Sequence, residues 1–141
     1  MEASLEGLGD AAETTRVIAI TQLTSTSPEA LKTEQLVDVP LVESVRNYAK
    51  LAQAAGLAGV VCSAHEAADI ASVTGPNFLR VTPGIRPTGS AVGDQSRVAT
   101  PSNAASMGSS AIVVGRPITK ADDPVAAYHA IRDDWNAGRK A

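Results

Sequence analysis

Four short apolar segments, rich in β-branched residues, alternate along the chain with stretches of helical pattern. They lie at residues 16–21, 58–62, 78–82 and 111–115. Each is mostly apolar on both faces, as expected for strands buried in a parallel sheet. Strands of this kind separated by helices predict an α/β fold with parallel strands.

Amphipathic patterns fill the intervals between the predicted strands. Residues 41–55 place apolar side chains on one side and stop at Gly56, a favourable C-terminal cap. Another helix is expected over residues 2–8, with no predicted strand before it. The predicted order is therefore one helix followed by four βα units.

Three helix starts carry recognisable capping residues. Ser63 and Glu66 have the spacing of a capping box, which predicts a helix as far as about Ser72. Thr100 and Asp123 each precede a proline, a pair of residues typical of the first positions of a helix.

Size and composition narrow the class of protein. A chain of 141 residues suits a single domain with a hydrophobic core, so residues 1–141 are predicted to form one unit. It has 12 basic and 15 acidic residues and only 3% aromatic residues. Proteins that bind nucleic acid usually have a clustered basic surface and aromatic side chains that stack on bases. No nucleic-acid partner is therefore predicted.

Targeting signals are not visible in the sequence. The first residues have no apolar run of the kind found in a signal peptide, and no stretch is long enough to span a bilayer. A single cysteine, Cys62, fits a reducing compartment. We therefore predict a cytoplasmic protein without a membrane partner.

Glycine and arginine occur together where the third and fourth predicted strands end. Gly84 and Arg86 follow the third strand, and Gly115 and Arg116 follow the fourth. Glycine lets backbone N–H groups approach an anion, and a guanidinium matches phosphate oxygens in a bidentate manner. Turn glycines with solvated arginines are the alternative, but the pair of motifs favours an anion site. The long loop over residues 82–100 is typical of a lid or a binding loop.

Hydroxyl groups follow the first predicted strand, over residues 24–27. They could bind a polar heterocycle or cap the next segment, and residue chemistry alone favours capping. Cys62, His65 and Glu66 resemble a nucleophile pair or a metal site, but no third orienting group or second ligand cluster accompanies them. We interpret them as a buried thiol, a surface histidine and a capping glutamate.

Four stretches match one family in order and spacing. They are Thr21-Gln-Leu-Thr-Ser-Thr26, Gly59-Val-Val-Cys-Ser-Ala64, Val81-Thr-Pro-Gly-Ile-Arg-Pro87 with Asp94-Gln-Ser-Arg97, and Val114-Gly-Arg-Pro-Ile-Thr119. Taken together they resemble the orotidine 5′-phosphate decarboxylase family over nearly the whole chain. The resemblance implies a (β/α)₈ TIM barrel, of which this chain would form the partial barrel with strands five to eight.

The family is a homodimer that converts orotidine 5′-monophosphate (OMP) to UMP without a cofactor. By resemblance, Arg86, Gly115 and Arg116 would hold the 5′-phosphate, and Gln95 would reach from the phosphate toward the base. The resemblance also implies that Thr24 and Ser25 meet the pyrimidine and that Pro83 packs near the base. Residue chemistry alone favours a capping role for Thr24, whereas the resemblance favours a contact with the pyrimidine.

One part of the family pattern is missing. The family's charged network, an Asp-x-Lys-x-x-Asp motif with another Lys and Asp, has no match here, and the lysines are Lys32, Lys50, Lys120 and Lys140. We therefore predict no catalytic residue in this chain, which would need a complementing N-terminal half. A non-catalytic half-barrel that binds nucleotide phosphate or self-associates is the alternative. A sugar-phosphate decarboxylase of the same superfamily is disfavoured by the motifs around Arg86 and Gln95.

Overall fold

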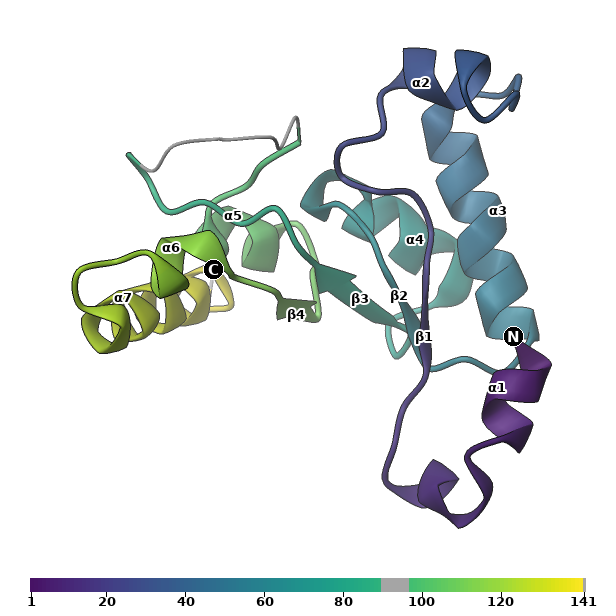
Figure 1. The fold of residues 1–141 in the computed structure, drawn as a ribbon, viewed down its shortest axis with the longest axis horizontal. Helices are drawn as coiled ribbons and strands as arrows, with labels where there is room; N and C mark the ends of the chain where they lie inside the picture. The colour runs from purple at the N-terminus through teal and green to yellow at the C-terminus, as the bar shows by residue number, and fades with distance from the viewer. Residues whose placement is uncertain (90–96, 141) are drawn as a thin grey trace.

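A computed structural model describes residues 1–89 and 97–140, in which four strands form one parallel sheet (Figure 1). The strands are β1 (Ile18–Ile20), β2 (Gly59–Val61), β3 (Leu79–Thr82) and β4 (Ala111–Ile112), and they lie side by side in chain order. All three pairings are parallel. The predicted α/β class and the four predicted strands are confirmed.

The helices are shorter and more numerous than the sequence patterns predict. Those named from the sequence are present, whereas α2, α6 and the 3₁₀ helix η1 were not predicted. Their bounds are α1 (Glu2–Glu6), η1 (Gly9–Glu13), α2 (Pro28–Thr33), α3 (Leu41–Ala54), η2 (Ala64–Glu66), α4 (Ala67–Thr74), α5 (Pro101–Ser106), α6 (Arg116–Thr119) and α7 (Pro124–Gly138).

The predicted helix caps form as expected. The Thr100 hydroxyl accepts the backbone N–H of Asn103 at 3.2 Å, and the Asp123 carboxylate accepts two N–H groups of α7 at 3.0 Å each. Ser63 and Glu66 form the predicted capping box at the start of η2. Each cap satisfies backbone donors that the first helical turn leaves without a partner.

Helices cover one face of the sheet. Ala19 and Val60 pair across β1 and β2 and pack on α3 and α4, where Val45 and Ile70 are fully buried. At the other end of the sheet, Ile112 packs with α5 and α7. Figure 1 shows α3 and α4 gathered beside β1 and β2, and α5 to α7 gathered beside β4.

The opposite face of the sheet is open, which corrects the expectation that both faces are buried. Ile20, Val61, Val81 and Ala111 stand in one row across the four strands. The Ile20 side chain is 60% exposed at the edge of this row, and Val113 beyond β4 is 51% exposed. The apolar sequence of the strands predicts that other residues pack against this face. The described residues do not bury it.

Arg80 ties several turns together at the amino end of β3. Its side chain is buried, and its guanidinium donates to the carbonyl oxygens of Phe78 at 2.6 Å and Gly108 at 2.8 Å. Longer bonds reach the carbonyls of Gly75 and Pro76, at 3.4 and 3.3 Å. These carbonyls lie just beyond the ends of α4 and α5, so Arg80 joins both helix ends to the sheet.

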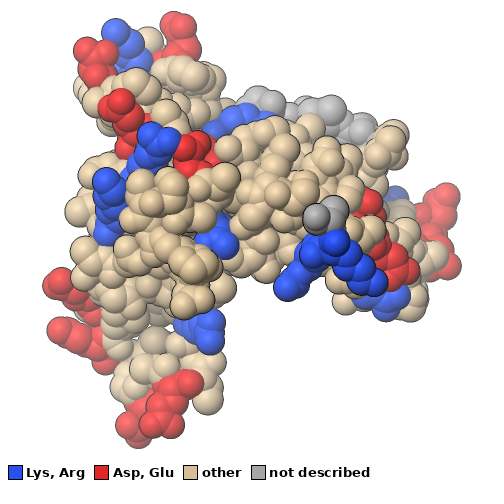
Figure 2. Space-filling view, turned by 180° about the vertical axis from the view of Figure 1, so that it is seen from behind, with Lys and Arg blue, Asp and Glu red and all other residues tan. Residues whose placement is uncertain are grey.

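Charged side chains of both signs are interspersed over the face drawn in Figure 2. Acidic residues gather near α1 and η1, where Glu2, Glu6, Asp10 and Glu13 lie within a short stretch of chain.

Among the described residues, no helix has the length and apolar character needed to cross a bilayer.

We expect the isolated chain to form dimers or larger species. Within the part of the chain described, β1 and β4 each pair with one neighbour only, so each presents a strand edge with backbone groups free to pair. Sedimentation should show association that Ile20→Glu weakens roughly tenfold or more, because a charge would enter the apolar face. Val125→Glu, on the exposed side of α7, is the matched control and should change little. A well-folded monomer at high concentration would contradict this expectation.

Candidate functional site

The carboxyl ends of the four parallel strands meet at one edge of the sheet. Thr24 and Ser25 follow β1, Pro83 and Arg86 follow β3, and Arg116 follows β4. Because neighbouring strands lie about 4.8 Å apart, the ends of β1 and β4 are separated by about 14 Å. The sequence-predicted residues therefore line this edge, with the hydroxyl groups at one end and the Gly-Arg pair at the other (Figure 1).

Gly115 and Arg116 are exposed where the chain turns from β4 into α6. A Cβ atom added at Gly115 would meet no other atom within 4 Å, so packing against neighbours does not explain the glycine. The open space beside its backbone is available to a ligand. Arg116 is the first residue of α6 and follows this glycine directly.

Arg86 stands at the base of the long loop that follows β3. Its backbone N–H donates to the Ala99 carbonyl at 2.9 Å, and Ile85 and Ala99 form a parallel bridge. The Arg86 side chain is half-buried and donates to the Ile85 carbonyl at 2.8 Å. The two ends of the loop are therefore held together beside β3, whereas Gln95 lies outside the described residues.

The segments that carry the two arginines come together at one cavity. Pro87 and Pro117, which follow Arg86 and Arg116 directly, both line a cavity of about 410 Å³ with residues of α5 and α7. The two arginine segments therefore lie in one region of the fold. Pro83 is half-buried just before this region.

Thr24 and Ser25 lie in a tight turn after β1. The turn is closed by a bond from the Thr26 N–H to the Leu23 carbonyl at 2.9 Å. Thr24 is buried, with 7% of its surface exposed, and Ser25 is exposed. The cap of α2 is Ser27, whose hydroxyl accepts the Ala30 N–H at 3.1 Å. The predicted capping role therefore belongs to Ser27 rather than to Thr24 or Ser25.

Arg97 makes contacts that the sequence analysis does not assign. Its guanidinium forms an ion pair with Glu66 and donates to the Leu23 carbonyl at 2.8 Å. The side chains of Arg97 and Glu66 are 19% and 7% exposed. The family motif around Asp94 and Arg97 marked this residue in the sequence, but contacts across more than seventy residues of chain cannot be read from it.

Comparison with known proteins places the chain in a family. The family model described as orotidine 5′-phosphate decarboxylase / HUMPS family matches residues 1–131. The chain belongs to this family. It is 99% identical to the orotidine 5′-phosphate decarboxylase of Cutibacterium acnes over all 141 residues, which cover 60% of that relative. The corresponding relative from Streptococcus uberis is 58% identical over 97% of this chain and 58% of the relative.

Solved structures of the family agree with the fold. The orotidine 5′-phosphate decarboxylase of Lactobacillus acidophilus superposes with a TM-score of 0.79 at 43% identity, covering 96% of this chain and 58% of that one. The predicted family and the predicted partial (β/α)₈ barrel are confirmed. The chain spans about 60% of the length of the curated relatives that it matches.

The residues that resembled a nucleophile or metal site have structural roles in this decarboxylase-family chain. Cys62 is fully buried, and burial together with the negative charge of Glu66 raises the pKa of its thiol from 9.0 to about 12. Glu66 accepts the Ser63 N–H at 2.9 Å, and His65 is exposed beside the Val98 carbonyl. The described residues hold no group of three or more His, Cys, Asp or Glu side chains suited to a metal ion.

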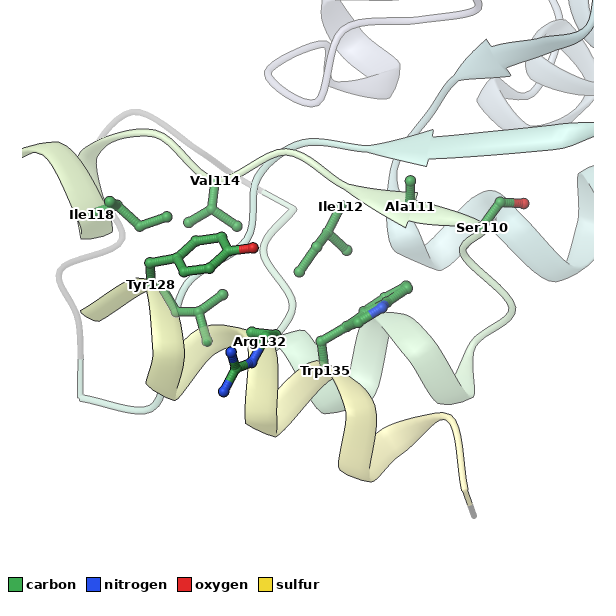
Figure 3. Close-up of a pocket in the computed structure, with 9 residues that line it drawn as sticks. Ser110, Ala111, Ile112, Val114, Ile118, Tyr128, Arg132 and Trp135 are labelled. Carbon is green, nitrogen blue, oxygen red and sulfur yellow. The ribbon is translucent and has the colours of Figure 1, made fainter. Parts of the chain in front are cut away.

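An apolar cavity of about 380 Å³ lies between β4 and α7 (Figure 3). Ile112, Val114, Ile118 and Trp135 supply much of its lining, and Arg132 is its one basic side chain. Figure 3 shows the Tyr128 ring between α7 and Val114. The cavity has no carboxylate or imidazole in its lining, so it offers a packing surface rather than a reaction site.

We expect Cys62 to make the chain less stable at alkaline pH. The thiol of the unfolded chain ionises near 9.0 and that of the folded chain near 12. The folded state therefore binds more protons between these values, and the free energy of unfolding falls as pH rises above 9. Urea unfolding at about pH 8 and about pH 10 should show a loss roughly 1 kcal/mol larger for the wild type than for Cys62→Ala. Equal losses in the two proteins would contradict the assignment.

Proposed function

We propose that this chain supplies the phosphate-binding and pyrimidine-binding part of an orotidine 5′-phosphate decarboxylase, which converts OMP to UMP and CO₂. The observation that carries the proposal is the row of predicted ligand residues along one edge of the sheet, in a chain of this family. Ligands of parallel α/β proteins bind at the carboxyl ends of the strands, where these residues lie.

The phosphate end of the nucleotide would bind between β3 and β4. The backbone of Gly115 faces open space there, and Pro87 and Pro117, which follow Arg86 and Arg116, line the same cavity. A guanidinium donates charge-assisted hydrogen bonds to phosphate oxygens, and these are about twice as strong as bonds between neutral groups. Two guanidinium groups from neighbouring strand ends suit a dianionic phosphate.

The pyrimidine end of the nucleotide would bind beside the carboxyl end of β1. Ser25 is exposed and Thr24 lies in the same turn, so the Ser25 hydroxyl group is accessible to a heterocycle. Pro83, at the end of β3 between the two ends of the site, would pack near the base. Gln95 remains part of the proposal from its motif alone.

The chain would contribute binding energy, while the reacting groups would come from the rest of the protein. Interactions with the phosphate can hold the substrate and help to assemble a charged site at the reacting carbon. Proton donation to the carbanion would fall to a lysine outside this chain, because the Asp-x-Lys motif is not in it. The proposal includes a homodimer, or a complementing N-terminal half, in the cytoplasm, with no cofactor.

We expect Arg116→Ala to weaken UMP binding by roughly 30- to 1000-fold, which corresponds to about 2–4 kcal/mol for one charged hydrogen-bonding partner. The protein for this test joins the chain in one polypeptide to the part of the C. acnes relative that it does not cover, and is called the complemented protein below. Uridine, which lacks the phosphate, should bind weakly and be unaffected. Lys120→Ala removes the same charge four residues away and is the control. Calorimetric titration giving equal losses for UMP and uridine would refute the phosphate role.

We also expect the 141-residue chain alone to show no turnover of OMP, because stabilising and protonating a carbanion requires a positioned cation and acid. The complemented protein should convert OMP to UMP under the same conditions. A spectrophotometric decarboxylase assay compares the two proteins. Turnover by the chain alone would show that the reacting groups lie within it, and absence of turnover in both would favour a non-catalytic binding module.

A further inference from the structure

One side chain joins three strand-end segments that are far apart in the sequence. The Arg97 guanidinium pairs through Nη1 with Oε1 of Glu66, which follows β2. Through Nη2 it donates to the Leu23 carbonyl at 2.8 Å, and Nε lies 3.5 Å from the Thr24 carbonyl. All three nitrogens of the guanidinium therefore face protein acceptors, and two of these acceptors belong to the turn after β1.

Glu66 is itself held in place, so it gives Arg97 a fixed partner. Its Oε2 atom accepts the Ser63 N–H at 2.9 Å as part of the capping box, and Oε1 receives Arg97. Both side chains are largely shielded from water, which strengthens a charge-assisted pair and limits its motion. The position of the Arg97 guanidinium is thus set by the start of η2.

Gln22 anchors the chain just before the tip of the turn after β1, because its side-chain amide donates to Gln35 at 3.1 Å and to Ser44 at 3.3 Å. The Leu23 side chain is 59% exposed and does not bury the turn in the core. On the strand side, the Thr21 N–H and hydroxyl both donate to the Val61 carbonyl, at 3.2 and 3.1 Å, before the turn begins. At the tip itself, the bonds from Arg97 to the Leu23 and Thr24 carbonyls are long-range contacts that bear on how the turn presents Thr24 and Ser25.

We infer that Arg97 and Glu66 form a positioning pair that sets the turn at residues 23–25 for the pyrimidine end of the ligand. The inference rests on the proposed function, because it takes Thr24 and Ser25 as the groups that meet the base. Arg97 acts through the turn, since its donors are directed at Glu66 and at two backbone carbonyls. The proposed phosphate residues follow β4, which is three strands away from β1 along the same carboxyl-terminal edge.

In this arrangement the base and the phosphate contribute separately to the binding free energy of the ligand. Loss of the pair should weaken ligands that carry the base and spare ligands that carry only ribose and phosphate. UMP and ribose 5-phosphate, titrated calorimetrically into the complemented protein, are the two probes. Arg97→Gln should weaken UMP roughly tenfold or more and change ribose 5-phosphate less than about twofold.

Glu66→Gln provides the partner test. The amide oxygen of glutamine can still accept the Ser63 N–H, so the capping box is retained while the ion pair is lost. This variant should show the same selective loss of UMP, and the double variant should be no weaker than Arg97→Gln alone, because the two residues act as one unit. Arg97→Lys, which keeps the charge, should recover part of the UMP affinity.

Arg46→Gln is the matched control for an arginine–carboxylate pair. Arg46 of α3 pairs with Asp69 of α4, with side chains 40% and 36% exposed, and neither is a partner of Arg97 or of the turn at residues 23–25 in the contacts described. Arg46→Gln should change neither the affinity for UMP nor the affinity for ribose 5-phosphate. Thermal unfolding of each variant followed by circular dichroism shows whether the fold persists, and a purely structural role for Arg97 would lower both affinities together.

The outcomes separate the inference from the proposed function. If wild type binds both probes and Arg97→Gln weakens both equally, or weakens neither, the positioning role is overturned while the proposed function stands. If wild type binds UMP no more tightly than ribose 5-phosphate, the assignment of the pyrimidine end fails, and the inference fails with it. If wild type binds neither probe, the proposed function itself is overturned.

Discussion

The parallel pairing of the four strands in chain order is the constraint on which the rest of the structure depends. Parallel strands require a return segment after each strand, and these segments place α3 and α4 on one face with α5 and α7 farther along. The same order brings every strand's carboxyl end to one edge. Residues as far apart in the sequence as Thr24 and Arg116 therefore share that edge.

Two shielded arginines show how differently the two ends of the sheet are built. At the amino end, Arg80 is surrounded by backbone carbonyls that close the ends of helices. At the carboxyl end, Arg97 is paired with Glu66 and reaches backbone carbonyls of a turn beside the proposed ligand. The first arrangement holds elements together, whereas the second sets the shape of a surface. Positively charged side chains thus serve the scaffold at one end and the proposed site at the other.

Strand positions and helix caps could be predicted from the sequence because they depend on local patterns. The cap at Thr100 and the box at Ser63 involve residues within three positions of each other, and both form. The open face around Ile20 could not be predicted, because an apolar strand has the same sequence whether or not its cover belongs to the chain. The Arg97 contacts escaped prediction because they join distant segments. Gln95 lies outside the described residues, so its predicted role remains a sequence-based hypothesis.

The agreement between sheet order and chain order also bears on how such a chain emerges from the ribosome. Each strand pairs with the strand made just before it, so β2 can add to β1, and β3 to β2, before the rest has been synthesised. Contacts between successive units keep loop closure short at each step. The sheet can therefore grow in one direction as translation proceeds, and at every stage its newest strand provides the template for the next.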